Sequence, residues 1–229
     1  MIRVVAILAF LVGAVPSMVW ADFRILALGD SNTWGSNASG PRHGNDVRWG
    51  RVLDAALPNA VVVEEGRIGR RTDLGKGRAP DNIGKPVRTP IPELAGQHLP
   101  LDMAVVMLGT NDLQSGQGRD ADAVARSAFS LARILLDGGV EQVLVVTPPP
   151  LTNPERGGLS GIFGRSQELS EELPTAYARL SRETGIPVFD AGTVTRADGA
   201  DGVHLTAGAQ RALGAALVPV VQDLLPDNG

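Results

Sequence analysis

The stretch FRILALGDSNTWG, residues 23–35, decides how this chain folds. Its apolar half, ILAL at 25–28, has the composition of a buried strand, and GDS at 29–31 ends it. A serine just past the end of a parallel strand holds its hydroxyl at the mouth of the sheet, where open α/β folds build their sites. The alternative is that Ser31 or Asn32 only caps a helix, and this stretch alone leaves both interpretations open.

Strand and helix patterns alternate along the rest of the chain. This alternation implies βαβ units, a parallel sheet and right-handed crossovers. We therefore predict one three-layer α/β/α domain over residues 22–229, with five parallel strands in the order 2-1-3-4-5 and Thr206 capping the last helix. The further strands are expected at 60–63, 102–108, 142–147 and 187–190, and the helices at 47–57, 91–98, 121–136, 166–184 and 207–225.

Composition excludes several functional classes. The chain has 229 residues and a formal net charge of −4, so it has no basic excess for nucleic acid or an anionic membrane surface. It has no cysteine, which excludes disulfides, thiolate metal sites and cysteine catalysis. The three histidines lack metal-ligand spacing, and the phosphate-binding and dinucleotide-binding glycine motifs are absent. We expect neither a metal nor an organic cofactor.

The N-terminus has the layout of a secretory signal peptide. Arg3 supplies a positive head, residues 4–15 are apolar and uncharged, and residues 19–21, VWA, form the expected cleavage site before Asp22. The apolar run is short for a membrane span, although an uncleaved anchor is the alternative. We expect residues 1–21 to be removed, with export to the periplasm or the exterior and no integral span afterwards.

One histidine is placed to activate a serine. Of His43, His98 and His204, only His204 closely follows an aspartate, in DGVH at 201–204. A carboxylate at Asp201 can bond the imidazole Nδ1 and leave Nε2 facing the serine. The alternative is an Asx-turn that starts the last helix.

Hydrogen-bond donors that could stabilise a developing negative charge follow the predicted strands on either side of the first one. Asn111 follows the third predicted strand as Ser31 follows the first, and the order 2-1-3 makes these strand ends neighbours. Gly69 follows the second strand, and without a Cβ its N–H can approach a ligand closely. The N–H groups of Ser31 and Gly69 and the Asn111 side chain would together form an oxyanion hole.

Four short blocks, as a set, resemble the ordered blocks of the SGNH (GDSL) hydrolase superfamily: GDS at 29–31, Gly69, GTND at 109–112 and DGVH at 201–204. The resemblance spans about residues 22–225. It implies a flavodoxin-like fold and ester hydrolysis through an acyl-serine without a metal. It also implies that Ser31 is the nucleophile, His204 the base and Asp201 its orienting partner, with oxyanion donors at Ser31, Gly69 and Asn111.

A narrower resemblance is to the arylesterase and acetyl-transferring branch of that superfamily. It rests on GDSNTWG at 29–35 and EEGRIGRRT at 64–72, and it implies that Trp34 walls a small acyl pocket. The chain departs from the branch where Asn32 replaces the usual leucine and Arg71 a threonine. Asn32 adds a polar group beside the nucleophile, and Arg71 adds bulk and charge near the oxyanion loop. Gly69 has the glycine of the wider superfamily where the branch often has alanine.

Two long loops border the expected site. Residues 66–90 carry seven Lys and Arg residues and either favour an anionic substrate or form a solvated or subunit-contact surface. Residues 151–164 include Ile162 and Phe163, which either cover the site or anchor the loop. The expected substrate-binding residues are Asp30, Trp34, Ile162 and Phe163.

These observations favour an exported serine esterase for short, acetyl-type esters, such as acetylated sugars or aryl acetates, with acyl transfer to alcohols as a second outcome. The alternatives are a thioesterase or lysophospholipase for longer acyl chains, and a non-catalytic carbohydrate- or envelope-binding protein on the same fold. The expected partner is a small-molecule ester, and the resemblance leaves a homo-oligomer open.

Overall fold

The computed structural model describes residues 23–72 and 90–226. The predicted signal peptide, residues 1–21, lies outside the described residues. So does the part of the basic loop at 73–89.

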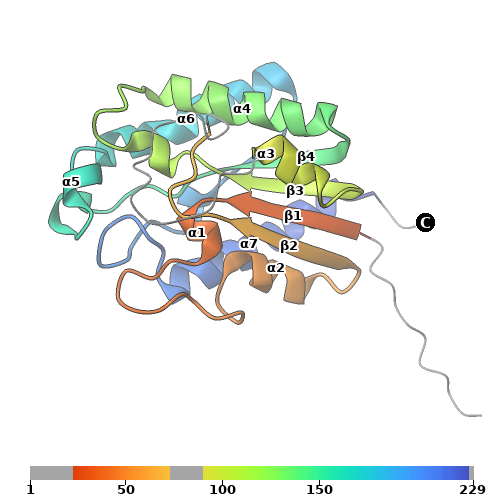
Figure 1. The fold of residues 1–229 in the computed structure, drawn as a ribbon, viewed down its shortest axis with the longest axis horizontal. Coiled ribbons are helices and arrows are strands. Elements are labelled where there is room, and N and C mark those ends of the chain that lie inside the picture. The colour runs from red at the N-terminus through yellow and green to blue at the C-terminus, as the bar shows by residue number, and fades with distance from the viewer. Residues whose placement is uncertain (1–22, 73–89, 227–229) are drawn as a thin grey trace, which may run out of the picture.

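The described residues form one parallel sheet with the strand order β2-β1-β3-β4-β5. This confirms the predicted order, and Figure 1 shows β1 lying between β2 and β3. The predicted and observed bounds agree closely. The largest difference is at β2, which runs three residues beyond its predicted end at residue 63. Strand β4 begins two residues before its predicted start and directly follows the Gly138–Gly139 turn. The strands are β1 (Phe23–Gly29), β2 (Ala60–Gly66), β3 (Leu101–Met107), β4 (Val140–Thr147) and β5 (Val188–Asp190).

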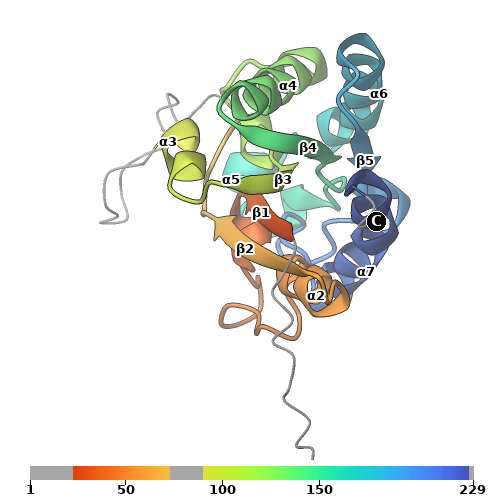
Figure 2. The same cartoon turned by 90° about the vertical axis from the view of Figure 1, so that its right-hand side faces the viewer.

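Helices cover both faces of the sheet, which confirms the three-layer architecture (Figures 1 and 2). One face is covered by α2 (Trp49–Ala56) and α7 (Ala207–Leu224), where Thr206 caps α7 as predicted by accepting the Ala209 N–H. The other face is covered by α3 (Ile91–Gly96), α4 (Ala121–Asp137) and α6 (Gln167–Thr184).

Strand β1 is the centre of the core because it is buried on both faces. Ile25 and Ala27 pack with the side chains of α2 and α7, whereas Leu26 and Leu28 pack with those of α3, α4 and α6. All four side chains are fully buried. A parallel strand covered on both sides has no polar face, which explains why the sequence there is a continuous apolar run.

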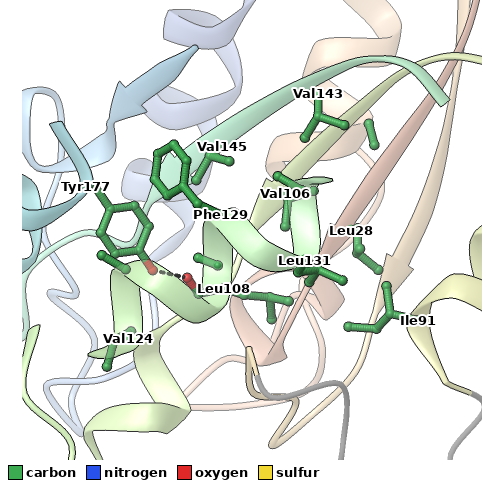
Figure 3. Packing of buried hydrophobic residues seen from close by; sticks show 14 of the residues in the cluster. Leu28, Ile91, Val106, Leu108, Val124, Phe129, Leu131, Val143, Val145 and Tyr177 are labelled. Atoms are coloured by element: carbon green, nitrogen blue, oxygen red, sulfur yellow. Dashed lines mark hydrogen bonds between the residues drawn. The ribbon is translucent and has the colours of Figure 1, made fainter. Parts of the chain in front are cut away.

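The end of β3 is fixed by a buried tyrosine (Figure 3). The Tyr177 hydroxyl, from α6, donates a 2.8 Å hydrogen bond to the Leu108 carbonyl, and the Phe129 ring packs edge-on against Tyr177 with centroids 5.9 Å apart. Leu108 directly follows β3, so this contact holds the point at which the chain leaves the sheet. The next residues form a short 3₁₀ helix, η1 (Thr110–Leu113).

Several short helices were not predicted from the sequence. The chain turns directly from β1 into α1 (Ser31–Trp34), and the predicted loop 151–164 contains η2 (Pro154–Arg156) and α5 (Ser160–Phe163). A further 3₁₀ turn, η3 (Ala191–Thr193), follows β5. Helices of three or four residues contain too little periodicity to be recognised in a sequence.

We predict that Gly66→Ala destabilises the fold by about 3 kcal/mol, at the upper end of typical overpacking costs. A Cβ on residue 66 would lie 2.1 Å from the Trp34 nitrogen and 2.5 Å from the Thr33 carbonyl carbon, so β2 and α1 would have to separate. Urea unfolding measures the loss.

The matched control is Gly96→Ala, at the last residue of α3, where an added Cβ meets nothing within 4 Å. This variant should be unchanged or stabilised by up to about 1 kcal/mol, because alanine favours helix more than glycine does. Equal stability of the two variants would contradict the close approach of β2 and α1.

Candidate active site

Ser31 is held at the carboxyl end of β1 by a sharp strand-to-helix turn. Asp30 caps α1, because its Oδ1 accepts the Asn32 N–H at 2.8 Å. Ser31 is the first residue of the helix, where an N–H has no intrahelical acceptor. Gly35 ends the helix in the left-handed region at φ +88°. The alternative cap, Ser31 or Asn32, is therefore not the one observed.

A chain of hydrogen bonds joins Ser31 to His204 and Asp201. The Ser31 Oγ lies 3.0 Å from His204 Nε2, and His204 Nδ1 lies 2.6 Å from Asp201 Oδ2. The ring can donate through Nδ1 to the carboxylate and accept the serine proton at Nε2. A hydroxyl, an imidazole and a carboxylate in this order are the arrangement in which a histidine activates a serine.

The loop before α7 orients the Asp201 carboxylate. Its Oδ1 accepts the N–H groups of Val203 and His204, at 3.0 and 2.9 Å, while Oδ2 faces the ring. Burial raises the pKa of Asp201, but the hydrogen bonds from the His204 ring and from these two N–H groups outweigh it. The pKa therefore falls from 3.8 to about 2. The carboxylate remains ionised beside the imidazole at neutral pH.

The turn after β2 lies against the end of β1. The Gly29 carbonyl accepts the Arg67 N–H at 3.1 Å and Arg70 Nη1 at 2.8 Å, which holds Gly69 next to the Ser31 turn. Within the described part of the chain, the Gly69 N–H has no acceptor, and a Cβ added to Gly69 would meet nothing within 4 Å. Its φ of +74° favours glycine, which gives a physical reason why this chain lacks the alanine common in the arylesterase-like branch.

Asn111 comes from η1, after β3, and reaches the same turn. Its Nδ2 donates to the Arg70 carbonyl at 3.1 Å and lies 3.4 Å from Asp30 Oδ2. Gln114 Nε2 donates to Asn111 Oδ1 at 3.0 Å, which sets the orientation of the amide. The structure thus places Asn111 beside the residue that precedes Ser31.

Two residues expected to bind substrate are buried. Asp30 is 1% exposed, and burial raises its pKa from 3.8 to about 6, against the opposing effects of the Asn32 N–H and the His204 charge. Phe163 is 3% exposed and packs in the core cluster beneath α4 and α6. Neither side chain opens to solvent in this structure, and their substrate-binding roles stay predictions.

The other two expected substrate-binding residues are more accessible. Trp34 is partly buried, with the Arg42 guanidinium 4.7 Å from its ring centroid and Arg42 Nε donating to its carbonyl at 2.6 Å. Ile162 is 43% exposed, and its carbonyl accepts the Ser115 N–H at 2.7 Å, so α5 lies against the segment that follows η1. Their roles also stay predictions.

Sequence reasoning missed a network that joins the loops after β2 and β3. Thr72 donates both its N–H and its hydroxyl to the Asp112 carboxylate, at 3.0 and 2.6 Å, and Arg119 also contacts that carboxylate. Arg71, expected near the oxyanion loop, is buried and donates to Gln117 Oε1 at 2.6 Å. The GTND block contains Asp112, but its partner Thr72 lies 40 positions away and carries no local signal.

No cluster of three or more His, Asp or Glu side chains within residues 23–72 and 90–226 could hold a metal ion. None of the helices in the same residues combines the length and the apolar character needed to cross a membrane.

We predict that Asp201→Asn removes a pH-dependent part of the stability. Because the pKa of Asp201 is about 2 in the folded chain, against an ordinary value of 3.8, the unfolded chain takes up the proton first as the pH falls. The wild-type advantage over the variant should be fully present above about pH 4 and should shrink towards pH 2. Urea unfolding of both proteins across this range measures the difference in their free energies of unfolding. A difference that does not change with pH would contradict the lowered pKa of Asp201.

The comparisons with known proteins agree with this geometry. The sequence model of the GDSL-like Lipase/Acylhydrolase family matches residues 27–212. The native aryl esterase of M. smegmatis is 35% identical with a TM-score of 0.78, over 89% of this chain and 100% of that one. A carbohydrate acetylesterase from Sinorhizobium meliloti is 33% identical with a TM-score of 0.79, also over 89% of this chain and 100% of that one.

No curated protein sequence matches the chain. The family match nevertheless covers most of its length, and the solved structures named above share its fold over 89% of this chain. The chain therefore belongs to the GDSL-like lipase/acylhydrolase family, within the SGNH superfamily, and it is a carboxylic ester hydrolase.

Proposed function

We propose that this chain is a serine esterase that hydrolyses short-chain, acetyl-type esters through an acyl-serine intermediate. The observation that carries the proposal is the 3.0 Å contact between Ser31 Oγ and His204 Nε2, continued to Asp201 at 2.6 Å. These distances support acyl transfer to the serine, because that reaction needs a hydroxyl, an imidazole and a carboxylate in hydrogen-bond contact in this order.

In the first half of the reaction, His204 Nε2 accepts the Ser31 proton while Oγ attacks the ester carbonyl carbon. The carbonyl π electrons move onto oxygen, and the Asp201 carboxylate stabilises the imidazolium that forms. The tetrahedral intermediate then collapses, and the bond to the leaving alcohol breaks as His204 returns the proton to it. Ser31 is left acylated.

Three donors are proposed to hold the oxyanion: the N–H of Ser31, the N–H of Gly69 and one N–H of the Asn111 amide. The two backbone N–H groups are supported by their positions at a helix start and at a glycine turn. The Asn111 amide keeps one hydrogen on the Arg70 carbonyl. Its 3.4 Å contact with Asp30 is long for a hydrogen bond, so the second hydrogen is the one offered to the oxyanion.

In the second half, water takes the place of the alcohol. His204 accepts a proton from the water as its oxygen attacks the acyl carbon, and then returns the proton to Ser31 Oγ as the acyl bond breaks. An alcohol that attacks in place of water would complete an acyl transfer. The two outcomes differ only in the nucleophile that reaches the acyl-enzyme.

A small acyl group is favoured by two considerations. Ser31 and Trp34 are three positions apart in α1, which brings their side chains to the same side of a helix, and Arg42 holds the indole in place. The two solved structures named in the comparisons above carry the names aryl esterase and carbohydrate acetylesterase. We assign the acyl side of the site to Trp34.

We predict that the purified chain hydrolyses p-nitrophenyl acetate and that Ser31→Ala lowers kcat by about 10⁶-fold, the loss typical of a missing nucleophile. A series of p-nitrophenyl esters from acetate to decanoate should show the highest kcat/KM at the short end.

A wild-type chain without activity that also fails to react with a fluorophosphonate would favour a binding protein on this fold. An optimum at the long end of the series would favour the thioesterase or lysophospholipase alternative. Activity that survives Ser31→Ala would exclude the acyl-serine mechanism.

For the oxyanion hole, Asn111→Ala is expected to lower kcat by about 10²–10³-fold with a much smaller change in KM, because the amide acts on charge that develops only in the transition state. Gln114→Ala serves as a comparison, since Gln114 contacts the Asn111 oxygen and only orients the amide. It should lose less activity than Asn111→Ala. The reverse order would remove Asn111 from the oxyanion hole.

A further inference from the structure

The peptide groups around His204 are all hydrogen-bonded, and half of the bonds come from its own loop. The Asp201 carboxylate accepts the N–H groups of Val203 and His204. The His204 carbonyl accepts the Gly199 N–H at 2.8 Å. These three contacts shape the loop, but they do not fix its distance from Ser31.

The other half of the bonds come from the segment that begins at the nucleophile. Asn32 Nδ2 donates to the Val203 carbonyl at 3.2 Å, and Asn32 Oδ1 accepts the Leu205 N–H at 3.0 Å. His43 Nε2 contacts the Leu205 carbonyl at 3.0 Å. One amide side chain therefore brackets His204, with a bond to the residue on each side of it.

Asn32 is itself firmly held. It is 1% exposed, its N–H donates to Asp30 Oδ1, and its carbonyl accepts Gln210 Nε2 at 2.8 Å. Gln210, from α7, in turn accepts the Trp49 N–H at 3.0 Å. Every polar atom of Asn32 has a partner, so the side chain has little freedom to follow a moving loop.

From these contacts we infer that Asn32 is a positioning residue that sets the distance between the Ser31 hydroxyl and the His204 imidazole. The inference rests on the proposed function, because Asn32 acts only through His204. A closed ring of contacts supports it: one peptide bond joins Asn32 to Ser31, two hydrogen bonds join it to the residues flanking His204, and the 3.0 Å contact between Ser31 and His204 completes the ring.

This role differs from what the sequence alone suggests. The sequence indicates only a polar group beside the nucleophile or a helix cap, whereas in the structure the amide faces the loop that carries His204 and is buried. The leucine usual at this position in related chains is of similar size and can make neither bond. In this chain the departure from the family pattern belongs to the support of the base rather than to the acyl pocket.

The test compares Asn32→Leu with the wild type on p-nitrophenyl acetate. Without the two bonds the loop can shift, and a misplacement of about 1 Å at a reacting group costs about 10²-fold in rate. We expect kcat to fall by about that factor while KM stays within about twofold. Asn37→Leu is the matched control, because the Asn37 side chain bonds only the nearby Ser39 N–H in the described residues, and its kcat should not change.

A double-variant cycle separates positioning from a general loss of structure. His204→Ala retains a residual rate from the oxyanion donors, and in that background Asn32→Leu should cause no further loss, since there is no base left to position. A merely structural role would lower the residual rate by the same factor as in the wild type. Such multiplication of the two losses would overturn the inference.

Asn32→Asp covers the case in which the leucine variant does not fold. It keeps an acceptor for the Leu205 N–H but turns a carboxylate oxygen towards the Val203 carbonyl, so fluorophosphonate labelling of the folded variant should slow by at least about tenfold. Labelling at the wild-type rate would contradict the inference. An inactive wild type, or an active Ser31→Ala, would instead contradict the proposed function.

Discussion

The pairing of β1 with β2 on one side and β3 on the other is the constraint on which the site depends. In this register Gly29 lies opposite Gly66 and Met107, so the three strands end together at one edge of the sheet. Ser31, Gly69 and Asn111 lie in the turns that follow these three strands, so they are close together at that edge. A slip in either pairing would separate these groups, although each strand would remain buried.

His204, the proposed base, is not positioned by strand pairing. His204 lies in a loop before α7, and β5, the last strand before it, lies at the far edge of the sheet from β2. Sheet register therefore does not bring it to Ser31. Side-chain hydrogen bonds from Asn32 and His43 to the backbone of that loop close the gap. Strand pairing thus positions Ser31, Gly69 and Asn111, whereas buried polar contacts position His204.

Much of the fold could be predicted from the sequence for a physical reason. Strands covered on both faces appear as continuous apolar runs, as at 25–28, and parallel crossovers restrict the possible strand orders. Several site residues could also be predicted from the sequence, because Ser31 and Asn111 each follow a recognisable strand and His204 follows an aspartate at a short spacing. The sequence could not show contacts between distant positions. Asn32 and Val203 are 171 residues apart, and no local motif around either residue predicts that they form a hydrogen bond. The same applies to Phe163, whose four-residue helix gives no periodic signal of its burial.

The buried carboxylate of Asp30 lowers the stability of the fold at neutral pH. Because burial raises the pKa of Asp30 from 3.8 to about 6, the folded state favours the protonated form, and this contribution to stability is lost as the pH rises through about 6. At neutral pH the fold therefore holds a charge that burial disfavours, offset by the Asn32 N–H. The His204 charge also opposes the effect of burial on the pKa of Asp30, and it lowers the pKa of Asp201, whose carboxylate contacts the ring directly. Asp30 and Asp201 are therefore both coupled electrostatically to the ring that lies against the Ser31 hydroxyl.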